Sequence, residues 1–140
     1  MAAFIIRALR GENFSYPPNP YFSDVPTTHP FFRYVQKMRE LGITNGCSAT
    51  EYCPDAPVTR GQMSVFLVRA RLGVSSEAGI MFPASPYFND VAGGHPFFVY
   101  IQKLRQMGIT VGCTVSEYCP DQATTRAQMA AFLIRAFFTP

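Results

Sequence analysis

Apolar side chains recur every three or four residues in five stretches of the chain, the spacing that gathers them on one face of an α-helix. Two of these stretches follow Pro30 and Pro96, and each ends at a glycine, Gly42 or Gly108. Their apolar positions are Phe31, Tyr34, Val35, Met38 and Leu41, and then Phe97, Tyr100, Ile101, Leu104 and Met107. Proline suits the first position of a helix, and glycine often ends one. The pattern therefore predicts helices that begin near the two prolines and end at the two glycines.

Two further stretches are each headed by a threonine and a glutamine three residues later. Thr59 with Gln62, and Thr125 with Gln128, have the spacing of a capping box, in which each side chain bonds the other residue's backbone amide. The apolar stripe after the first cap is Met63, Phe66, Leu67 and Ala70. This arrangement predicts a second helix that begins directly after each threonine.

The helices belong to an internal repeat at a constant offset of about 66 residues, as from Cys47 to Cys113. The segment Met1–Ala8 matches Met63–Ala70 and Met129–Ala136, so it is interpreted as a helix of the fold and not as a signal peptide. We expect residues 1–11 to be the last helix of a truncated first repeat. Residues 22–72 and 88–140 are two complete repeats, and residues 12–21 and 73–87 are ordered linkers. No helix can bury its apolar stripe alone, so the expected fold is an all-α array of helix-loop-helix units packed against their neighbours.

Composition excludes several classes of protein. Hydrophobic residues make up 48% of the 140 positions and charged residues 15%, too apolar for a disordered chain. The net charge of +3 gives no reason to expect nucleic acid as a partner. No apolar run approaches the ~20 residues of a transmembrane helix, so no membrane insertion is expected. There is no nucleophile elbow, phosphate-binding loop or acid/base dyad, so we expect neither an enzyme nor a cofactor.

The four cysteines form two pairs, Cys47 with Cys53 and Cys113 with Cys119, each enclosing five residues. A disulfide within each loop is the favoured interpretation, and it implies an oxidising compartment. The alternatives are a four-cysteine zinc site and free thiols. Zinc ribbons favour two to four residues between paired ligands, and no histidine lies near either pair, so we expect no metal site.

Arg60 and Arg126 directly follow the capping threonines, where a cation opposes the helix dipole. One interpretation is that each arginine, with the free amides of the helix start, holds a carboxylate or phosphate. The other is an ion pair with Asp55 or Asp24. Among the remaining polar residues, Asp24 and its copy Asp90 are expected to cap nearby backbone amides, and His29 and His95 to cap or pack. The tyrosines of the two cysteine loops, Tyr52 and Tyr118, either stack on a sugar or cover their loops.

Taken in order, these motifs resemble the repeat of the S-layer homology (SLH) domain. The matching elements are Phe22-Ser23-Asp24-Val25, His29-Pro30, Gly42-Ile43, Cys53-Pro54-Asp55 and Thr59-Arg60-Gly61-Gln62, each with a second copy. The chain departs from the family pattern at three points. Pro30 and Pro96 replace its tryptophan, Gln62 and Gln128 replace its glutamate, and a cysteine-bracketed ring replaces its Gly-Tyr-x-Asp-Gly loop.

The resemblance implies a bundle with pseudo-threefold symmetry, usually of three repeats. It also implies a cell-envelope location (extracellular, cell surface or periplasm) and non-covalent anchoring to acidic, often pyruvylated, cell-wall polysaccharide. The glycan-binding role of the family's arginine falls on Arg60 and Arg126.

A second expectation concerns assembly. The stripe formed by Met1, Phe4, Ile5 and Ala8 lacks a partner helix from its own repeat. A neighbouring copy that covered this stripe head to tail would build a homo-oligomer or a filament, which predicts a self-assembling structural protein as the alternative function.

Overall fold

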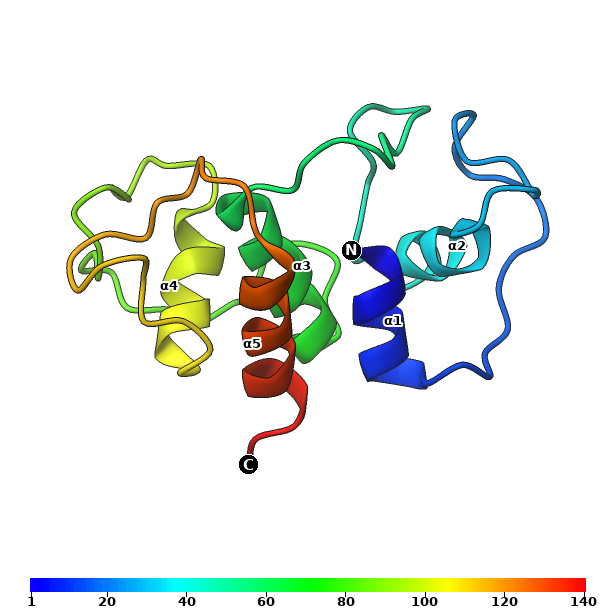
Figure 1. Cartoon of the computed structure of the whole chain (residues 1–140). Helices are drawn as coiled ribbons and strands as arrows, with labels where there is room; N and C mark the ends of the chain where they lie inside the picture. The colour runs from blue at the N-terminus through cyan, green and yellow to red at the C-terminus, as the bar shows by residue number, and fades with distance from the viewer.

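The computed structural model describes all 140 residues and contains five α-helices joined by long loops (Figure 1). The helices are α1 (Ala2–Arg10), α2 (Phe32–Glu40), α3 (Arg60–Leu72), α4 (Phe98–Gln106) and α5 (Arg126–Phe137). There is no strand; the only β-type pairing is an isolated bridge between Thr59 and Ala123. The all-α fold predicted from the periodicity is confirmed. None of the five helices combines the length and apolar character needed to cross a membrane.

The capping boxes of α3 and α5 are confirmed in full. The Thr59 hydroxyl accepts a hydrogen bond from the Gln62 amide at 3.1 Å, and the Gln62 side chain accepts one from the Thr59 amide at 3.0 Å. Thr125 and Gln128 reproduce both bonds at 3.1 Å. These pairs satisfy amides that would otherwise lack a partner in the first helical turn, so each helix begins directly after its threonine.

Helices α2 and α4 begin two residues later than their prolines predict. The residues around Pro30 form a turn instead, in which the imidazole Nδ1 of His29 accepts the Phe31 amide at 3.1 Å. The carbonyl of His29 accepts the Phe32 amide at 3.0 Å, and His95 makes the equivalent bonds in the second repeat. Each histidine therefore bonds and packs within the turn that precedes the helix, and the helix begins near the proline, at Phe32 or Phe98, and not at the proline itself.

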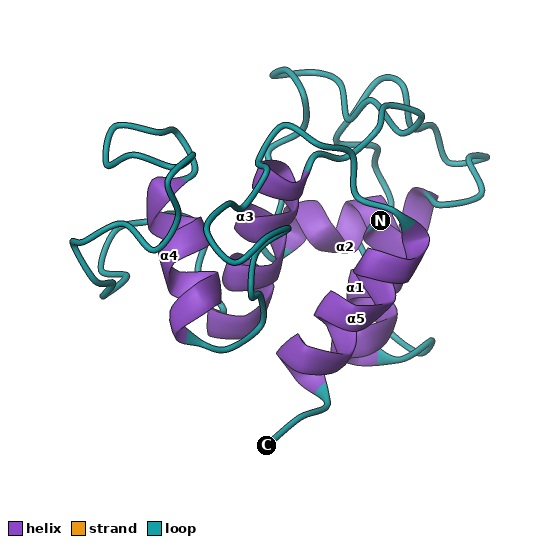
Figure 2. Cartoon of the chain, turned by 60° about the vertical axis from the view of Figure 1, so that its left-hand side comes forward, coloured by secondary structure: helices purple, strands orange, loops and turns teal.

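The first helix of each repeat packs against the last helix of the preceding repeat and not against its own partner. Helix α2 packs on α1, and α4 packs on α3, whereas the backbones of α2 and α3 do not approach each other closely. Helix α5 packs against both α1 and α3 and links the two pairs, as Figures 1 and 2 show from two sides. The expectation that neighbouring repeats share a core is confirmed, and the pseudo-threefold arrangement stays a prediction.

A buried glutamine in each first helix holds the preceding linker in place. The Gln36 side chain donates to the carbonyls of Pro17 and Asn19 at 2.8 and 2.7 Å and accepts the Tyr21 amide at 3.0 Å. Gln102 repeats all three bonds with residues 83, 85 and 87. Because burying an unpaired amide side chain is costly, three bonds on each glutamine order the linkers, as expected from their composition.

Candidate functional site: the inter-repeat grooves

The cysteine loops are closed as predicted. Cys47 is bonded to Cys53 and Cys113 to Cys119, which excludes the zinc and free-thiol alternatives for these four residues. Asp24 anchors the first loop, because its carboxylate accepts the amides of Tyr52 and Cys53 at 2.9 and 2.7 Å. Burial alone would raise the pKa of Asp24, but these two hydrogen bonds outweigh it and lower the pKa below its ordinary value.

Asp90 anchors the second loop in the same way, accepting the amides of Tyr118 and Cys119 at 2.8 and 2.7 Å. Both aspartates cap backbone amides, but these amides lie 28 and 29 residues away and not nearby as expected. The two anchors fix the position of the tyrosine next to each disulfide, of which Tyr52 lines a cavity between repeats and Tyr118 is fully buried.

The segment after the second disulfide lies across the N-terminus of α3. The Arg60 amide donates to the Gln122 carbonyl at 2.8 Å, and the Gly61 amide donates to the Pro120 carbonyl at 2.9 Å. Only glycine fits at position 61, because a Cβ there would lie 2.4 Å from the ring of Phe97. Loop carbonyls from the following repeat thus occupy amides at the start of α3 that would otherwise face solvent.

Arg60 is buried in this junction, with only 3% of its surface exposed. Its Nε donates to the Tyr118 carbonyl at 2.8 Å, and its guanidinium carbon lies 4.8 Å from the Tyr118 ring centre and 5.4 Å from that of Phe132. The Tyr118 hydroxyl returns a hydrogen bond to the Arg60 carbonyl at 2.7 Å. Arg60 makes no ion pair, so the alternative of a bond to Asp24 or Asp55 is wrong. Its Nη2 atom is buried and has no hydrogen-bond partner.

A groove of about 560 Å³ lies beside Arg60, between the second cysteine loop and α5. Its polar lining combines cationic, acidic and amide side chains: Arg60, Glu117, Gln122, Gln128 and Arg135. Phe132 of α5 adds an apolar surface next to them. Cationic, amide and aromatic groups together are the usual composition of a binding site for an acidic sugar.

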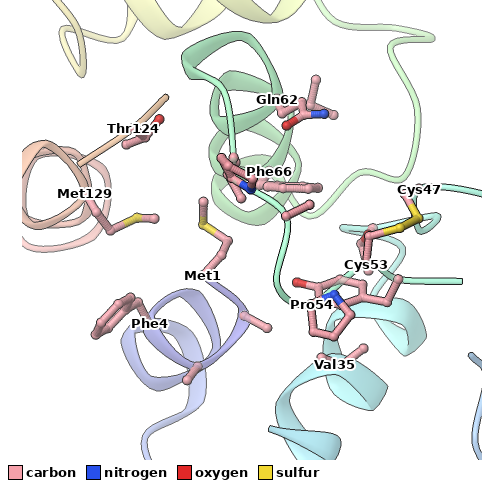
Figure 3. A pocket seen from close by; sticks show the side chains of 18 of the residues that line it. Met1, Phe4, Val35, Cys47, Cys53, Pro54, Gln62, Phe66, Thr124 and Met129 are labelled. Carbon is pink, nitrogen blue, oxygen red and sulfur yellow. A yellow bond between two sulfur atoms is a disulfide. The ribbon is translucent and has the colours of Figure 1, made fainter. Parts of the chain in front are cut away.

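A second, larger cavity of about 720 Å³ lies between α1, α3, α5 and the first cysteine loop (Figure 3). In the close view, Met1 (the residue before α1), Phe4 of α1, Phe66 of α3, Met129 of α5 and the Cys47–Cys53 disulfide lie around it. Arg126 also lines this cavity, but it is exposed, and neither a salt bridge nor a side-chain hydrogen bond holds it.

The residues of the expected assembly stripe have different environments. Met1 and Phe4 line the larger cavity, and 40% of the Phe4 surface is exposed. Ala8 is half-buried, and Ile5 is fully buried in the core that α1 forms with α2. Ile5 is therefore inside the chain's own core and is not available to a neighbouring molecule.

The sequence reasoning missed the contact between Arg60 and Tyr118. The signal for it was present, since each tyrosine and each arginine recurs at the repeat offset. What the sequence did not reveal is that the arginine of one repeat meets the tyrosine of the next, because that pairing depends on how the repeats pack.

Comparison with known proteins agrees with this architecture, in which repeated helical units build grooves between them. Residues 21–64 and 87–130 each match the S-layer homology domain, and the two matches cover more than half of the chain. The chain belongs to the SLH domain family.

Two curated proteins are similar to this chain. One is an endoglucanase of Bacillus sp. (strain KSM-635), 33% identical over 138 residues, which cover 98% of this chain and 14% of that protein. The other is a cell surface protein of Thermoanaerobacter kivui, 31% identical over 115 residues, or 82% of this chain and 15% of that protein. The similarity thus spans about a seventh of each relative. The SLH domain is a non-catalytic module that anchors proteins at the cell envelope, which places this chain at the cell surface.

Proposed function

We propose that the chain anchors to the cell wall by binding an acidic, pyruvylated polysaccharide in the groove beside Arg60. The observation that supports this most directly is the buried Nη2 atom of Arg60, which has no hydrogen-bond partner within the protein. Leaving a charged donor buried and unpaired costs free energy, so the site gains when an anionic acceptor reaches it. A carboxylate, such as that of a pyruvate ketal, supplies the matching acceptor geometry.

The surroundings of Arg60 suit this role. Tyr118 and Phe132 hold the guanidinium between their rings, which fixes its orientation before a ligand arrives. Gln122, Gln128 and Arg135 line the same groove and offer further donors to sugar hydroxyls and to the carboxylate.

Arg126 is proposed as a second glycan contact, at the rim of the larger cavity. The equivalence with Arg60 in the repeat supports this role. In contrast to Arg60, Arg126 is not oriented by any neighbouring ring, so we expect the smaller contribution from it.

The test is a pull-down with purified cell-wall glycan from a Gram-positive bacterium that carries pyruvate ketals. We expect Arg60→Ala to weaken binding about ten- to a hundredfold, the effect of losing a charge-assisted hydrogen bond. Arg60→Lys keeps the charge but loses the planar fork, so it separates loss of recognition from loss of folding. Arg71→Ala removes an exposed arginine that lines neither groove and serves as the matched control.

Unchanged binding in Arg60→Ala and in Arg126→Ala would remove both proposed sites. A further experiment removes the pyruvate from the glycan chemically. Unchanged binding would then exclude the ketal as the ligand, while the groove would still be an anchoring site.

We also propose that the surface around Met1 and Phe4 takes part in association. The supporting observation is that these side chains line a large, open cavity and that Phe4 is substantially exposed. Size-exclusion chromatography with light scattering tests the head-to-tail homo-oligomer, and a monomer at high concentration excludes it.

A further inference from the structure

The larger cavity between α1, α3, α5 and the first cysteine loop corresponds, within the repeat, to the groove beside Arg60. Four positions of the repeat line both spaces, as Thr44, Cys47, Gln62 and Arg69 in the cavity and as Thr110, Cys113, Gln128 and Arg135 in the groove. Because the two spaces share these positions, the residues in which they differ show what each of them is suited to bind.

The larger cavity lacks two polar side chains that line the groove. Gln122 lines the groove, whereas the residue at the same position of the first repeat, Ala56, lines the cavity. Glu117 also lines the groove, whereas its copy Glu51 does not line the cavity. A sugar has a hydroxyl group on most of its carbon atoms, and each one that is buried needs a hydrogen-bond partner. The interior of the larger cavity is therefore less suited to a sugar ring than the groove is.

Apolar side chains make up most of the lining of the larger cavity. Phe66 of α3, Met129 of α5 and Pro54 lie around it (Figure 3), and Val65 of α3 lines it where the groove has the smaller Ala131. Its volume of about 720 Å³ lies within the range of small-ligand pockets, ~300–1,000 Å³. Removing such an apolar surface from water is favourable, so the cavity is suited to a hydrocarbon group of that size.

The charged side chains that line the cavity are all cationic. They are Arg7, Arg69 and Arg126, and neither an aspartate nor a glutamate lines the cavity. Glu12 pairs with Arg7, and Arg126 is exposed. A ligand that brings a negative charge into the cavity therefore meets complementary charge and no acidic side chain that would repel it.

Arg69 has no acidic partner of its own. Its Nε and Nη2 atoms donate to the Tyr100 hydroxyl, both at 3.2 Å, and its Nη1 atom donates to the Ile43 carbonyl at 3.4 Å. Arg7 occupies the same position in α1, and its Nε atom donates to the carboxylate of Glu12. The chain thus contains one example of an arginine at this position that holds a carboxylate, and Arg69 is the copy without one.

The charge of Arg69 lies next to the apolar wall. Residues three and four apart share one face of a helix, so Val65, Phe66 and Arg69 lie on the same side of α3. Phe66 and Arg69 are separated by about 5 Å along the helix axis, at 1.5 Å per residue. A ligand that contacts both therefore combines a negative group with a hydrocarbon part directly attached to it.

We propose that the larger cavity binds an aliphatic carboxylate, with the carboxylate on Arg69 and the hydrocarbon chain against Val65, Phe66 and Met129. The apolar lining strengthens the pairing of charges, because an ion pair is screened less where water is scarce. The inference goes beyond the anchoring function and does not depend on glycan binding, since Arg60 does not line this cavity.

The experiment titrates the full chain in a calorimeter with octanoate, octanol and acetate, each below the concentration at which it aggregates. We expect one octanoate to bind per chain. Octanol has the chain without the charge and should bind at least about tenfold more weakly, the effect of losing a charge-assisted hydrogen bond. Acetate has the charge without the chain and should show no measurable binding. Decanoate should bind about fifteenfold more tightly than octanoate, because each additional buried methylene contributes roughly fourfold.

Ala56→Glu locates the ligand by placing a negative charge in the lining of the cavity. Ala56 is exposed, so the change leaves the core intact. We expect octanoate to bind at least about threefold more weakly and octanol to keep its affinity. The matched control is Ala49→Glu, which adds the same charge at an exposed position of the first cysteine loop that lines neither space and should leave octanoate binding unchanged.

Arg69→Gln tests the assigned cation. Glutamine keeps a donor for the Tyr100 hydroxyl but removes the positive charge, so octanoate should bind about tenfold more weakly. The affinity for octanol should stay within about twofold of the parent, whereas a purely structural defect in the cavity would lower both affinities.

Absence of octanoate binding at all concentrations below micelle formation would overturn the proposal. Equal affinities for octanoate and octanol would also overturn it, because no cation would then contact the ligand. Equal losses in Ala56→Glu and Ala49→Glu would show a general effect of charge and contradict the assigned cavity. Arg60→Ala should leave octanoate binding unchanged, so failure of the glycan test with octanoate still bound, or the reverse, distinguishes this proposal from the anchoring function.

Discussion

The two cysteine loops have nearly the same local structure but different neighbours. Both are closed by a disulfide, both are anchored by an aspartate, and both pack their tyrosine on a phenylalanine, with ring centres 5.7 Å apart for Phe22 and Tyr52 and 5.6 Å for Phe88 and Tyr118. Tyr118 is then covered by Arg60, whereas no arginine covers Tyr52. The comparison teaches that the local sequence builds the loop, while the adjacent repeat decides whether it becomes part of a core.

The largest difference is expected when each tyrosine is truncated. Tyr118→Ala should lower the free energy of unfolding by about 3–5 kcal/mol, the usual cost of removing a fully buried aromatic ring. Tyr52→Ala should cost less than half as much, because Tyr52 faces the open cavity. Urea denaturation of the two variants measures both values. Equal losses would show that the contact of Tyr118 with Arg60 adds no stability to that of the tyrosine in its own loop.

The disulfides should give equal effects on stability and unequal effects on binding. Replacing either cysteine pair by serines opens a ring of the same size, so each double variant should lose about 2 kcal/mol. The Cys113→Ser/Cys119→Ser variant should weaken glycan retention more, because its loop lies across α3 and forms the Arg60 groove. Thermal unfolding measures the stability of the two double variants, and the glycan pull-down measures their retention. Weakened retention by the Cys47→Ser/Cys53→Ser variant alone would move the binding site to the larger cavity.

Removing one hydroxyl tests the contact at finer scale. Tyr118→Phe deletes the donor to the Arg60 carbonyl and should cost about 1 kcal/mol. Tyr52→Phe removes a hydroxyl that bonds to no group of the protein, so its stability should stay within about 0.5 kcal/mol of the parent. Matched urea unfolding curves distinguish the two variants, and a larger loss from Tyr52→Phe would contradict the comparison.

The smallest expected effect is a dependence on pH in the first loop. The pKa of Asp24 is lowered in the folded protein, so its contribution is fully present above the ordinary value of 3.8 and is lost as the pH falls through the lowered value. The difference in unfolding free energy between the parent and Asp24→Asn should therefore be constant near neutral pH and shrink in acid. Denaturation at a series of pH values checks this, and a difference that grows in acid would have the wrong sign.

Much of the local structure could be predicted from the sequence. The capping boxes at Thr59 and Thr125 and the left-handed glycines Gly42 and Gly108 depend on residues close in sequence or on a short turn. The aspartate anchors do not, since Asp24 and Asp90 bond amides 28 and 29 residues away. The disulfides followed from the spacing of the cysteines. The helix starts after Pro30 and Pro96 were predicted two residues early, because the histidine turn competes with the proline for the same backbone groups.

The candidate site was predictable only in part. Arg60 and Arg126 were selected because a cation after a helix cap is unfavourable unless something compensates for it. The compensation at Arg60 is the ring and carbonyl of Tyr118, 58 residues away, and no short-range pattern reports a contact of that length. The sequences around the two arginines are nearly the same, so they also gave no sign that one arginine is buried and the other exposed.

The sequence by itself determined the kinds of elements in this protein: five amphipathic helices, two closed loops and the capping boxes of α3 and α5. These features depend on the spacing of apolar side chains, on the backbone conformations that each residue type prefers and on bonds between residues close in sequence. Both complete repeats share these properties. Only the tertiary structure decided which helix of one repeat is covered by the neighbouring repeat, because burial depends on contacts with elements from distant parts of the chain. For that reason α3 is covered by the first helix of the next repeat, α4, and α5, with the same motif, has no such cover.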